Sequence, residues 1–285
     1  MKLFIPFFCI FLLFPFVVKP QKIQQNKRET DKDGRELVGN VHSVRIQRIL
    51  AYGNEFDGGW IPSLTIYNQN GFVQKFTAYN DKDELDYESI SEFDSSGNKI
   101  QETDYDKNKK ILRRTIRNFD ARGNMIEIKQ YGNADLSLIS WGKFLYNDKD
   151  YLISHTYFNK LGQPLGTTKH LYYRDWKKKG YVSHNPSGKL THQTNIYYKD
   201  KNIETVVFDK PRTIKFRHVS LVNETGDRVQ LTYNKNGKIL FKGNYSYERD
   251  EHGNWIKELC SEWRDKDGVL ILKRVKITTR TITYY

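Results

Sequence analysis

The residue types that most often carry out chemistry are scattered along this chain of 285 residues. Seven histidines are present, and they form neither a His-Glu-x-x-His pattern nor a zinc-type Cys/His spacing. His184 and His192 flank a predicted turn, where they could bind a metal or simply border the turn. The chain also lacks a Gly-x-Ser-x-Gly elbow and a glycine-rich phosphate loop. We therefore expect no catalytic residue, no bound metal and no cofactor.

Paired carboxylates are a further chemical possibility. A glycosidase needs two of them at a fixed separation, and Asp94, Asp104, Asp106 and Asp120 are the candidates. Their places beside predicted turns and on strand faces favour a structural role. An envelope hydrolase that acts on glycans, with a site assembled from distant residues, is the alternative to a non-enzymatic function.

The N-terminus predicts export. Lys2 precedes an apolar run of 16 residues, Leu3 to Val18, which resembles a secretory signal peptide and is short for a membrane span of about 20 residues. We expect residues 1–20 to be a signal peptide, or an uncleaved anchor because no clear cleavage site follows, and residues 21–39 to be a polar tether. The expected location is the periplasm, the outer cell surface or the medium. Only Cys260 would then remain, so no internal disulfide is expected.

Basic residues dominate the charge. The formal net charge of +13 falls to +11 when Lys2 and Lys19 leave with the signal peptide. The candidate polyanion-binding residues form one predicted hairpin tip and strand: Lys107, Lys109, Lys110, Arg113, Arg114 and Arg117. An exported protein would meet an acidic glycan, lipopolysaccharide or an acidic protein surface, and nucleic acid is not expected. These charges could equally be the solvated face of a sheet.

A repeated unit fills residues 40–285. It consists of an aromatic residue, Asp or Asn, two variable positions, Gly, often Asn, and then a strand-like segment. Aromatic starts at positions 67, 93, 119, 146, 173 and 198 recur every 25–27 residues, and a half-period of 12–15 residues fits one strand with one tight turn. The repeat's turn and core residues include Phe93, Asp94, Gly97, Asn98, Phe119, Asp120, Gly123, Asn124, Tyr233, Gly237, Tyr247, Gly253, Asn254 and Trp255.

These patterns predict an all-β fold of tandem β-hairpin repeats in a curled antiparallel meander, either an open solenoid-like sheet or a barrel-like one. The Asp or Asn can bond its own backbone, and Gly supplies the positive φ of a type I turn closed by a G1 bulge. The composition, with 14% aromatic residues, suits strands better than helices. The expected stacked core ladder is Tyr67, Phe93, Tyr105, Phe119, Tyr131, Tyr146, Phe158, Tyr233, Tyr247 and Trp263.

The aromatic–Asp–x–x–Gly–Asn units resemble the YD repeats of the rearrangement-hot-spot (Rhs) family. The best matches are Phe93–Asn98, Phe119–Asn124 and Asp250–Ile256, and the resemblance covers roughly residues 60–285. The end of the chain is similar to that of small exported bacterial YD-repeat proteins, most of them uncharacterised. The chain is far shorter than Rhs toxins and has no toxin-like C-terminal module. The resemblance and the predicted export together indicate a non-enzymatic binding or scaffold module of the bacterial cell envelope.

Overall fold

The computed structural model describes residues 35, 37–52, 62–132, 135–173, 177–199, 202–210 and 213–285. For residues 49–52 and 209–210 it describes the backbone and not the side chains. The predicted signal peptide, residues 1–20, and most of the predicted tether lie outside these ranges. The elements of the described part are strands. In chain order they are β1 (Val41–Tyr52), β2 (Ser63–Tyr67), β3 (Val73–Tyr79), β4 (Leu85–Phe93), β5 (Lys99–Asp106), β6 (Ile111–Phe119), β7 (Met125–Gly132), β8 (Ser137–Tyr146), β9 (Leu152–Asn159), β10 (Pro164–Tyr172), β11 (Lys178–His184), β12 (Leu190–Lys199), β13 (Asn202–Lys210), β14 (Thr213–Val222), β15 (Arg228–Asn234), β16 (Ile239–Arg249), β17 (Trp255–Lys266) and β18 (Val269–Tyr284).

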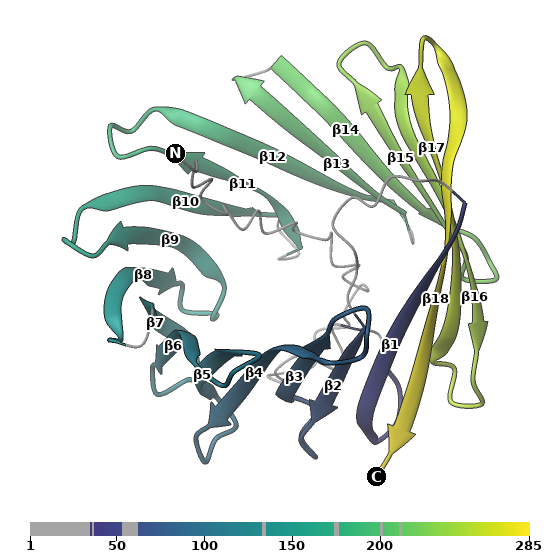
Figure 1. Cartoon of the computed structure of the whole chain (residues 1–285). Coiled ribbons are helices and arrows are strands. Elements are labelled where there is room, and N and C mark those ends of the chain that lie inside the picture. Colours follow the sequence, from purple (N-terminus) through teal and green to yellow (C-terminus); the bar gives the residue numbers. More distant parts are fainter. Residues whose placement is uncertain are drawn as a thin grey trace, which may run out of the picture.

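The sheet is closed. Each strand of the described residues pairs antiparallel with the next along the chain, and β18 pairs with β1 over a long register that runs from Val41↔Tyr284 to Tyr52↔Val275. Figure 1 shows the resulting ring, with β1 between β18 and β2. The predicted all-β meander of hairpins is thereby confirmed, and of its two forms the barrel is the one observed. Closure gives β1 and β18 a neighbour on both sides, so none of the described strands is an edge strand.

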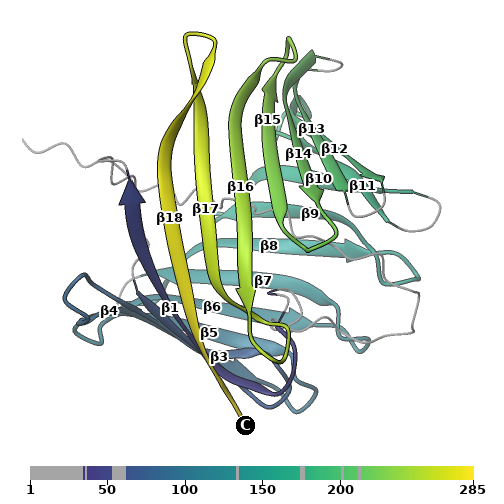
Figure 2. The same ribbon diagram turned by 90° about the vertical axis from the view of Figure 1, so that its right-hand side faces the viewer.

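The barrel wall is uneven. The strands β16, β17 and β18 are long, at 11, 12 and 16 residues, whereas β2 and β3 have 5 and 7. In Figure 2 the three long strands stand upright in the near wall, and β7, β8 and β9 run across them in the far wall. Twist between neighbouring strands, accumulated around the ring, gives this crossing.

The hairpin turns have the predicted chemistry. In the turn after β4, Asp94 Oδ1 accepts hydrogen bonds from the backbone N–H groups of Ser96 and Asn98, and Gly97 has a φ of +77°. Copies without glycine use the same conformation, since Lys109 and Asp150 have φ values of +63° and +62°. The register shifts at Glu92/Phe93, as expected when a bulge closes the turn.

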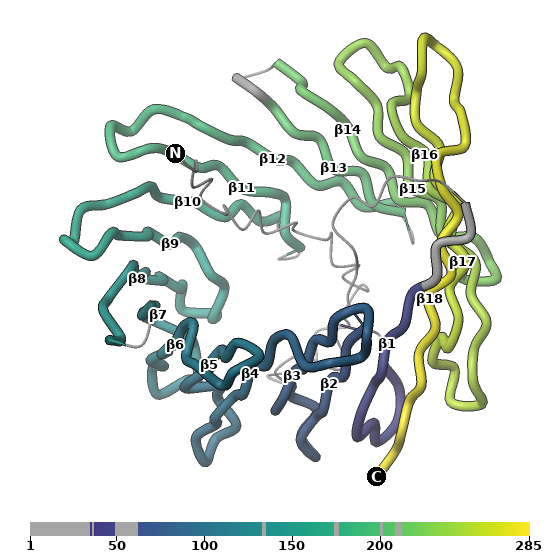
Figure 3. Tube along the Cα trace, viewed as in Figure 1, coloured from purple at the N-terminus to yellow at the C-terminus, as the bar shows by residue number. Residues whose placement is uncertain are grey.

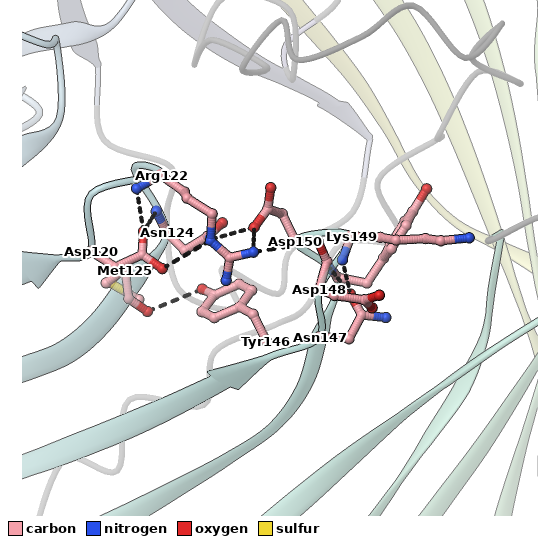
Figure 4. A network of polar contacts seen from close by, with 10 residues as sticks. Asp120, Arg122, Asn124, Met125, Tyr146, Asn147, Asp148, Lys149 and Asp150 are labelled. Carbon is pink, nitrogen blue, oxygen red and sulfur yellow. Dashed lines mark hydrogen bonds and ion pairs between the residues drawn. The ribbon is translucent and has the colours of Figure 1, made fainter.

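The repeat period places every second turn on the same rim of the barrel, where neighbouring turns touch. Two strands and two turns make up about one period, so the turns after β6 and β8 are neighbours. Asn124 Nδ2 donates to Asp150 Oδ1 at 2.7 Å, Arg122 pairs with Asp150 at 2.8 Å, and Tyr146 Oη donates to the carbonyl of Met125 at 3.1 Å (Figure 4). The Asn of the repeat therefore links one unit to the next.

The two ends of the folded region are joined by the last of these turns. Asn254, which is fully buried, accepts a hydrogen bond from the backbone N–H of Val38 and donates to the Val38 carbonyl and to Tyr284 Oη. Tyr285 Oη donates to the carbonyl of Tyr67 at 2.6 Å. Figure 3 shows the chain ending beside β1. We call this contact between the two ends the clasp.

A cluster of buried apolar residues lies at the clasp: Leu37, Val41, Val44 and Tyr67, with Ile46, Val73, Ile282 and Tyr284 packed against it. Leu37 falls in the segment predicted as a tether, so the packed region begins before residue 40. Of the ten residues in the expected core ladder, all of them described, Tyr67 is buried and the others are half-buried. They end at the barrel rims or line the wall, because a closed ring of hairpins has no single stack.

Candidate functional site

The strand registers divide the wall into an inner and an outer face. The face that carries Val44 and Thr65, which are paired across β1 and β2, also carries Thr115, Thr194 and Cys260, each at most 3% exposed. Side chains on the concave side of a curved sheet converge and crowd one another, and those on the convex side spread apart. We assign this face as the inner one from its crowding at β1, β12 and β17; on β3, β4 and β5 the opposite face also holds buried side chains, Thr77, Glu88 and Thr103.

Histidines and tyrosines line the inner face of β9, β10, β11 and β12. His155 Nδ1 and His170 Nε2 lie 3.1 Å apart, within hydrogen-bond distance. The rings of Tyr181 and His192 stack with centroids 5.4 Å apart, and His192 Nε2 is 2.8 Å from Thr194 Oγ1. We call this row, from His155 to His192, the histidine wall. It brings together residues that are up to 37 positions apart in the sequence.

Burial keeps the histidine wall uncharged. Loss of solvent lowers the pKa of His170 to about 4, with the nearby Lys178 cation and His155 adding to the effect. The pKa values of His155 and His192 are also lowered, in both cases mainly by burial and then by a lysine. Near neutral pH these imidazoles carry no charge, and each offers one nitrogen lone pair.

Aromatic rings pack around the histidine pair. The ring centroids of Phe144 and Tyr157 lie 5.6 Å and 5.4 Å from that of His155. Gly142 opposes Tyr157 in the neighbouring strand, and a Cβ at this position would come within 2.9 Å of the Tyr157 ring. The absent side chain therefore makes room for the ring over the strand, which holds it beside the histidine pair.

A second inner region, across β15, β17, β18 and β1, is cationic. We call it the cationic wall. Its charged members among the described residues are Arg48, Arg228, Arg274, Lys276, Arg280, Glu258 and Glu262. These seven residues are five cations and two carboxylates. Burial lowers the pKa of Arg48, with Arg274 adding to the effect and the two glutamates opposing it, yet a guanidinium stays protonated at any physiological pH.

Glu262 compensates part of this charge at close range. Its carboxylate is 5% exposed, accepts a hydrogen bond from Arg274 Nε at 2.6 Å and pairs with Lys276. Burial alone would raise the pKa of Glu262, but hydrogen bonds from the two cations lower it below its ordinary value. Beside it, burial raises the pKa of Cys260 to about 12, so the thiol stays protonated and unreactive.

Glu258 lies on the same strand face and has the opposite shift. Burial raises its pKa, although Arg280 and Arg48 oppose the change. Two carboxyl groups on one wall, one with a raised and one with a lowered pKa, are the pattern of a glycosidase acid and base. Four residues along a strand, however, place the two Cα atoms about 13 Å apart with parallel side chains. Glycosidase carboxyls lie roughly 5–9.5 Å apart, so this pair does not fit that chemistry.

The predicted polyanion-binding segment is divided by the fold. Arg113 and Arg117 are on the inner face, where they pair with Asp104 at 2.7 Å and Glu102 at 3.6 Å. Arg114 is on the outer face. Lys109 pairs with Glu88 at 2.7 Å, and Lys107 and Lys110 are exposed in the turn. The segment makes no single basic face, and its binding of polyanions stays a prediction.

The other sequence-predicted residues form turns. Asp120 and Asn124 repeat the bonds of Asp94 and Asn98, and Asn254 closes the clasp. Of the glycines predicted from the repeat, Gly97, Gly123, Gly237 and Gly253 all have a positive φ. The aromatic residues predicted with them are half-buried: Phe93, Phe119, Tyr233, Tyr247 and Trp255. Most of them position strands, but two also contact the cationic wall. Arg280 lies over the Trp255 ring, with its Cζ 3.3 Å from the ring centroid, and Tyr247 donates a hydrogen bond to the Glu258 carboxylate.

In the sequence, only His184 and His192 stand out as a pair, across one turn, and the histidine wall was therefore missed. The usable signal is the half-period. Once hairpin turns are fixed at 159–162 and 185–188, residues 155, 170, 181 and 192 fall on neighbouring strands. Strand alternation then assigns them to one face. The cationic wall has no such signal, because β1 and β18 pair only through closure of the ring.

Two absences among the described residues bear on the site. These residues contain no helix long and apolar enough to cross a membrane. Within the same ranges, no group of three or more His, Cys, Asp or Glu side chains is placed to hold a metal ion. A metal held here would therefore have to complete its coordination shell from water or from a ligand.

Comparisons with known proteins return likenesses of shape only. No protein family and no curated protein sequence matches the chain. Among solved structures, a porin-like protein from Bacteroides uniformis ATCC 8492 is similar over 86% of this chain and 98% of its own, with 9% identity and a TM-score of 0.47. TcdB2-TccC3 without its hypervariable C-terminal region is similar over 80% of this chain and 15% of its own, with 11% identity and a TM-score of 0.26. No functional inference follows from either, and the YD-repeat relation stays a resemblance.

Proposed function

We propose that this chain is an exported, non-enzymatic binding barrel of the bacterial cell envelope, and that its cationic wall binds an acidic saccharide. The observation that carries the proposal is the cluster of cations on one inner face. Arginines and one lysine from β1, β15 and β18 lie there around Glu258 and Glu262, and guanidinium groups keep their charge at any physiological pH. A partly desolvated positive wall attracts an anion more strongly than the same charges spread over an open surface.

The wall also favours a saccharide over an acidic protein surface. Phe241, Tyr245 and Tyr247 lie on the inner face of β16, next to the cations of β15 and β18. Flat aromatic faces suit stacking against sugar rings, and the guanidinium groups match carboxylate, sulfate or phosphate substituents. A folded acidic protein would have to enter the ring to reach this face. Acidic glycans and the phosphorylated sugars of lipopolysaccharide share the required chemistry.

The outer face supports a barrel surrounded by water. Among the described strands, charged side chains at outward positions include Arg45, Lys75, Glu88, Arg114, Glu127, Lys129, Lys143, Lys169, Glu204, Arg217, Lys242 and Lys257. A basic side chain on the lipid face of a barrel costs about 2–4 kcal/mol at the bilayer midplane. Exposed apolar residues such as Leu145, Tyr197 and Leu259 are interspersed with these charges. Ligand binding, and not passage through a bilayer, is the function we assign to the inner surface.

Export is a separate part of the proposal. It rests on Lys2 and the apolar run from Leu3 to Val18. Fractionation of the native host and N-terminal sequencing of the recovered protein test it directly. We expect a new N-terminus near residue 21 in an envelope or secreted fraction, and an intact Met1 in the cytoplasm would refute export without touching the binding claim.

Retention on immobilised heparin and on immobilised lipopolysaccharide tests the binding claim and separates the two sources. We expect the full chain to bind at low salt and to elute above physiological ionic strength. The inner variant, Arg48→Gln/Arg228→Gln/Arg280→Gln, should elute much earlier. The outer variant, Lys143→Gln/Lys169→Gln/Lys242→Gln, has the same net charge and should elute like the parent. Equal elution of the two variants would refute an inner binding site.

A further inference from the structure

The histidine pair lies in a different wall from the cations and has its own geometry. His155 and His170 come from neighbouring antiparallel strands, and both face the inside of the barrel. Their facing nitrogens, Nδ1 of His155 and Nε2 of His170, are 3.1 Å apart. We infer that these two nitrogens chelate a divalent transition-metal ion whose remaining coordination positions open to the barrel interior.

The separation of the nitrogens matches that of two ligands on one metal. Metal–imidazole bonds are about 2.0–2.1 Å long. Two such bonds meeting at an octahedral or tetrahedral angle place their nitrogens about 2.9–3.4 Å apart. The observed 3.1 Å lies inside this interval, and a metal can enter once both rings turn so that their lone pairs point at the metal instead of at each other. The proton now shared between the rings moves to the remote nitrogen of its own ring, and no proton is released.

The surroundings keep both imidazoles ready to bind. A metal competes with protons for the imidazole lone pair, and burial together with Lys178 lowers the pKa of both histidines. The rings of Phe144 and Tyr157 restrict the rotation of His155. The remote nitrogen of His170, Nδ1, is buried and has no hydrogen-bond partner among the described residues. In the chelate this nitrogen carries the proton of the neutral His170 ring, and no hydrogen bond of it is lost.

The donor set defines the class of metal. Two imidazoles without a thiolate suit Cu²⁺, Ni²⁺ or Zn²⁺, and the ordinary order of affinity puts Cu²⁺ first. With no third protein ligand among the described residues, water or an anionic ligand completes the shell. The Lys178 cation opposes a second positive charge nearby. Binding should therefore be weaker than at a closed structural site with three or four protein ligands.

Copper binding by the full chain, purified without a polyhistidine tag, tests the inference. We expect one Cu²⁺ per chain by calorimetric titration, and an electron paramagnetic resonance spectrum with hyperfine structure from two equivalent nitrogens. His155→Gln and His170→Gln should each weaken binding tenfold or more, which is about 1.4 kcal/mol. The double variant should be little worse than either single variant, because one imidazole alone does not chelate.

The matched control is His218→Gln. His218 is also on the inner face, but its Nδ1 contacts Thr232 Oγ1 and no second histidine. Its loss should leave the copper affinity unchanged. Equal weakening by His218→Gln, or a parent spectrum with only one coupled nitrogen, would overturn the inference. If a Gln variant fails to fold, as judged by circular dichroism, protection of His155 and His170 from diethylpyrocarbonate by Cu²⁺ decides instead, and equal modification with and without metal refutes the site.

Discussion

The histidine wall and the cationic wall occupy the same inner face and respond to burial in different ways. In the histidine wall, burial lowers the pKa values of His155, His170 and His192, and the side chains become neutral. Arginines have no neutral form at physiological pH. In the cationic wall the charge therefore persists, and Glu262 compensates it through Arg274 and Lys276.

The difference shows how one surface can hold two kinds of site. Neutral imidazoles present lone pairs, which suit a metal ion, whereas persistent guanidinium groups present donors, which suit an anion. The region around β5 and β6 is a third case, since Arg113 and Arg117 have Asp104 and Glu102 as close partners. Charge balance, more than the number of basic residues, decides which part of the wall attracts a ligand.

The largest expected loss of stability comes from removing the Glu262 carboxylate of the cationic wall. Glu262→Gln leaves Arg274 and Lys276 without their close anion in a partly desolvated place. Breaking one partner of such a buried pair costs about 3–5 kcal/mol. Urea unfolding followed by tryptophan fluorescence should show a lower midpoint. Glu258→Gln is the matched control, since burial already disfavours the charge of Glu258, and an equal loss in both variants would contradict the distinction between them.

As the pH falls, protonation of the histidine wall should destabilise the fold at a higher pH than protonation of Glu262. A histidine pKa lowered by folding means that the unfolded chain binds more protons, so stability is lost as pH falls from about 6.5 towards the folded value. For His170, with a folded pKa of about 4, the loss is roughly 3 kcal/mol across that window. The lowered pKa of Glu262 adds its own loss only below about 4.5.

Urea midpoints measured between pH 7 and pH 4 test this order. The parent should lose stability steadily through pH 6 and 5, and His155→Gln/His170→Gln should flatten that part of the curve. A parent curve that is flat down to pH 4.5 would mean that the histidines are not held neutral by the fold.

Lys178 is expected to have a smaller influence. Its cation is the second cause of the low pKa values of His155 and His170, after burial. Lys178→Met should therefore raise both pKa values part of the way towards 6.5 and strengthen Cu²⁺ binding. Proton NMR titration of the histidine ring resonances measures the shift. Unchanged pKa values would show that Lys178 does not act on the pair.

The smallest effect is expected at the β5–β6 turn. Lys107 and Lys110 are exposed there and belong to neither wall. Lys107→Gln/Lys110→Gln should change stability by no more than about 0.5 kcal/mol, and heparin elution should shift less than in the inner variant. A shift as large as that of the inner variant would move the anion site to this turn.

Much of the fold follows from local sequence. The Asp-x-x-Gly-Asn turns set strand positions, and the period of 25–27 residues places alternate turns on one rim. Ring closure could not be read in this way, because it depends on β1 pairing with β18 and on Asn254 reaching Val38, contacts that span 216 residues or more. The predicted single stack of aromatic residues is not formed for the same reason, because a closed ring distributes these residues over the wall and both rims.

The functional walls follow less from sequence than the turns do. The segment from Lys107 to Arg117 looked basic because sequence shows cations side by side and hides Asp104 and Glu102 across the strand pair. The cations of β1, β15 and β18 looked scattered because closure alone brings them together. Neutrality of the histidines depends on burial, which no local pattern in this chain reveals.

The salt dependence of binding to one acidic oligosaccharide tests the central claim most directly. Affinity for a polyanion falls with salt in proportion to the number of charge contacts made. We predict a steep fall for the parent and for the outer variant Lys143→Gln/Lys169→Gln/Lys242→Gln, and a clearly shallower one for the inner variant Arg48→Gln/Arg228→Gln/Arg280→Gln. A shallower slope for the outer variant, with the inner variant equal to the parent, would contradict an anion site inside the barrel.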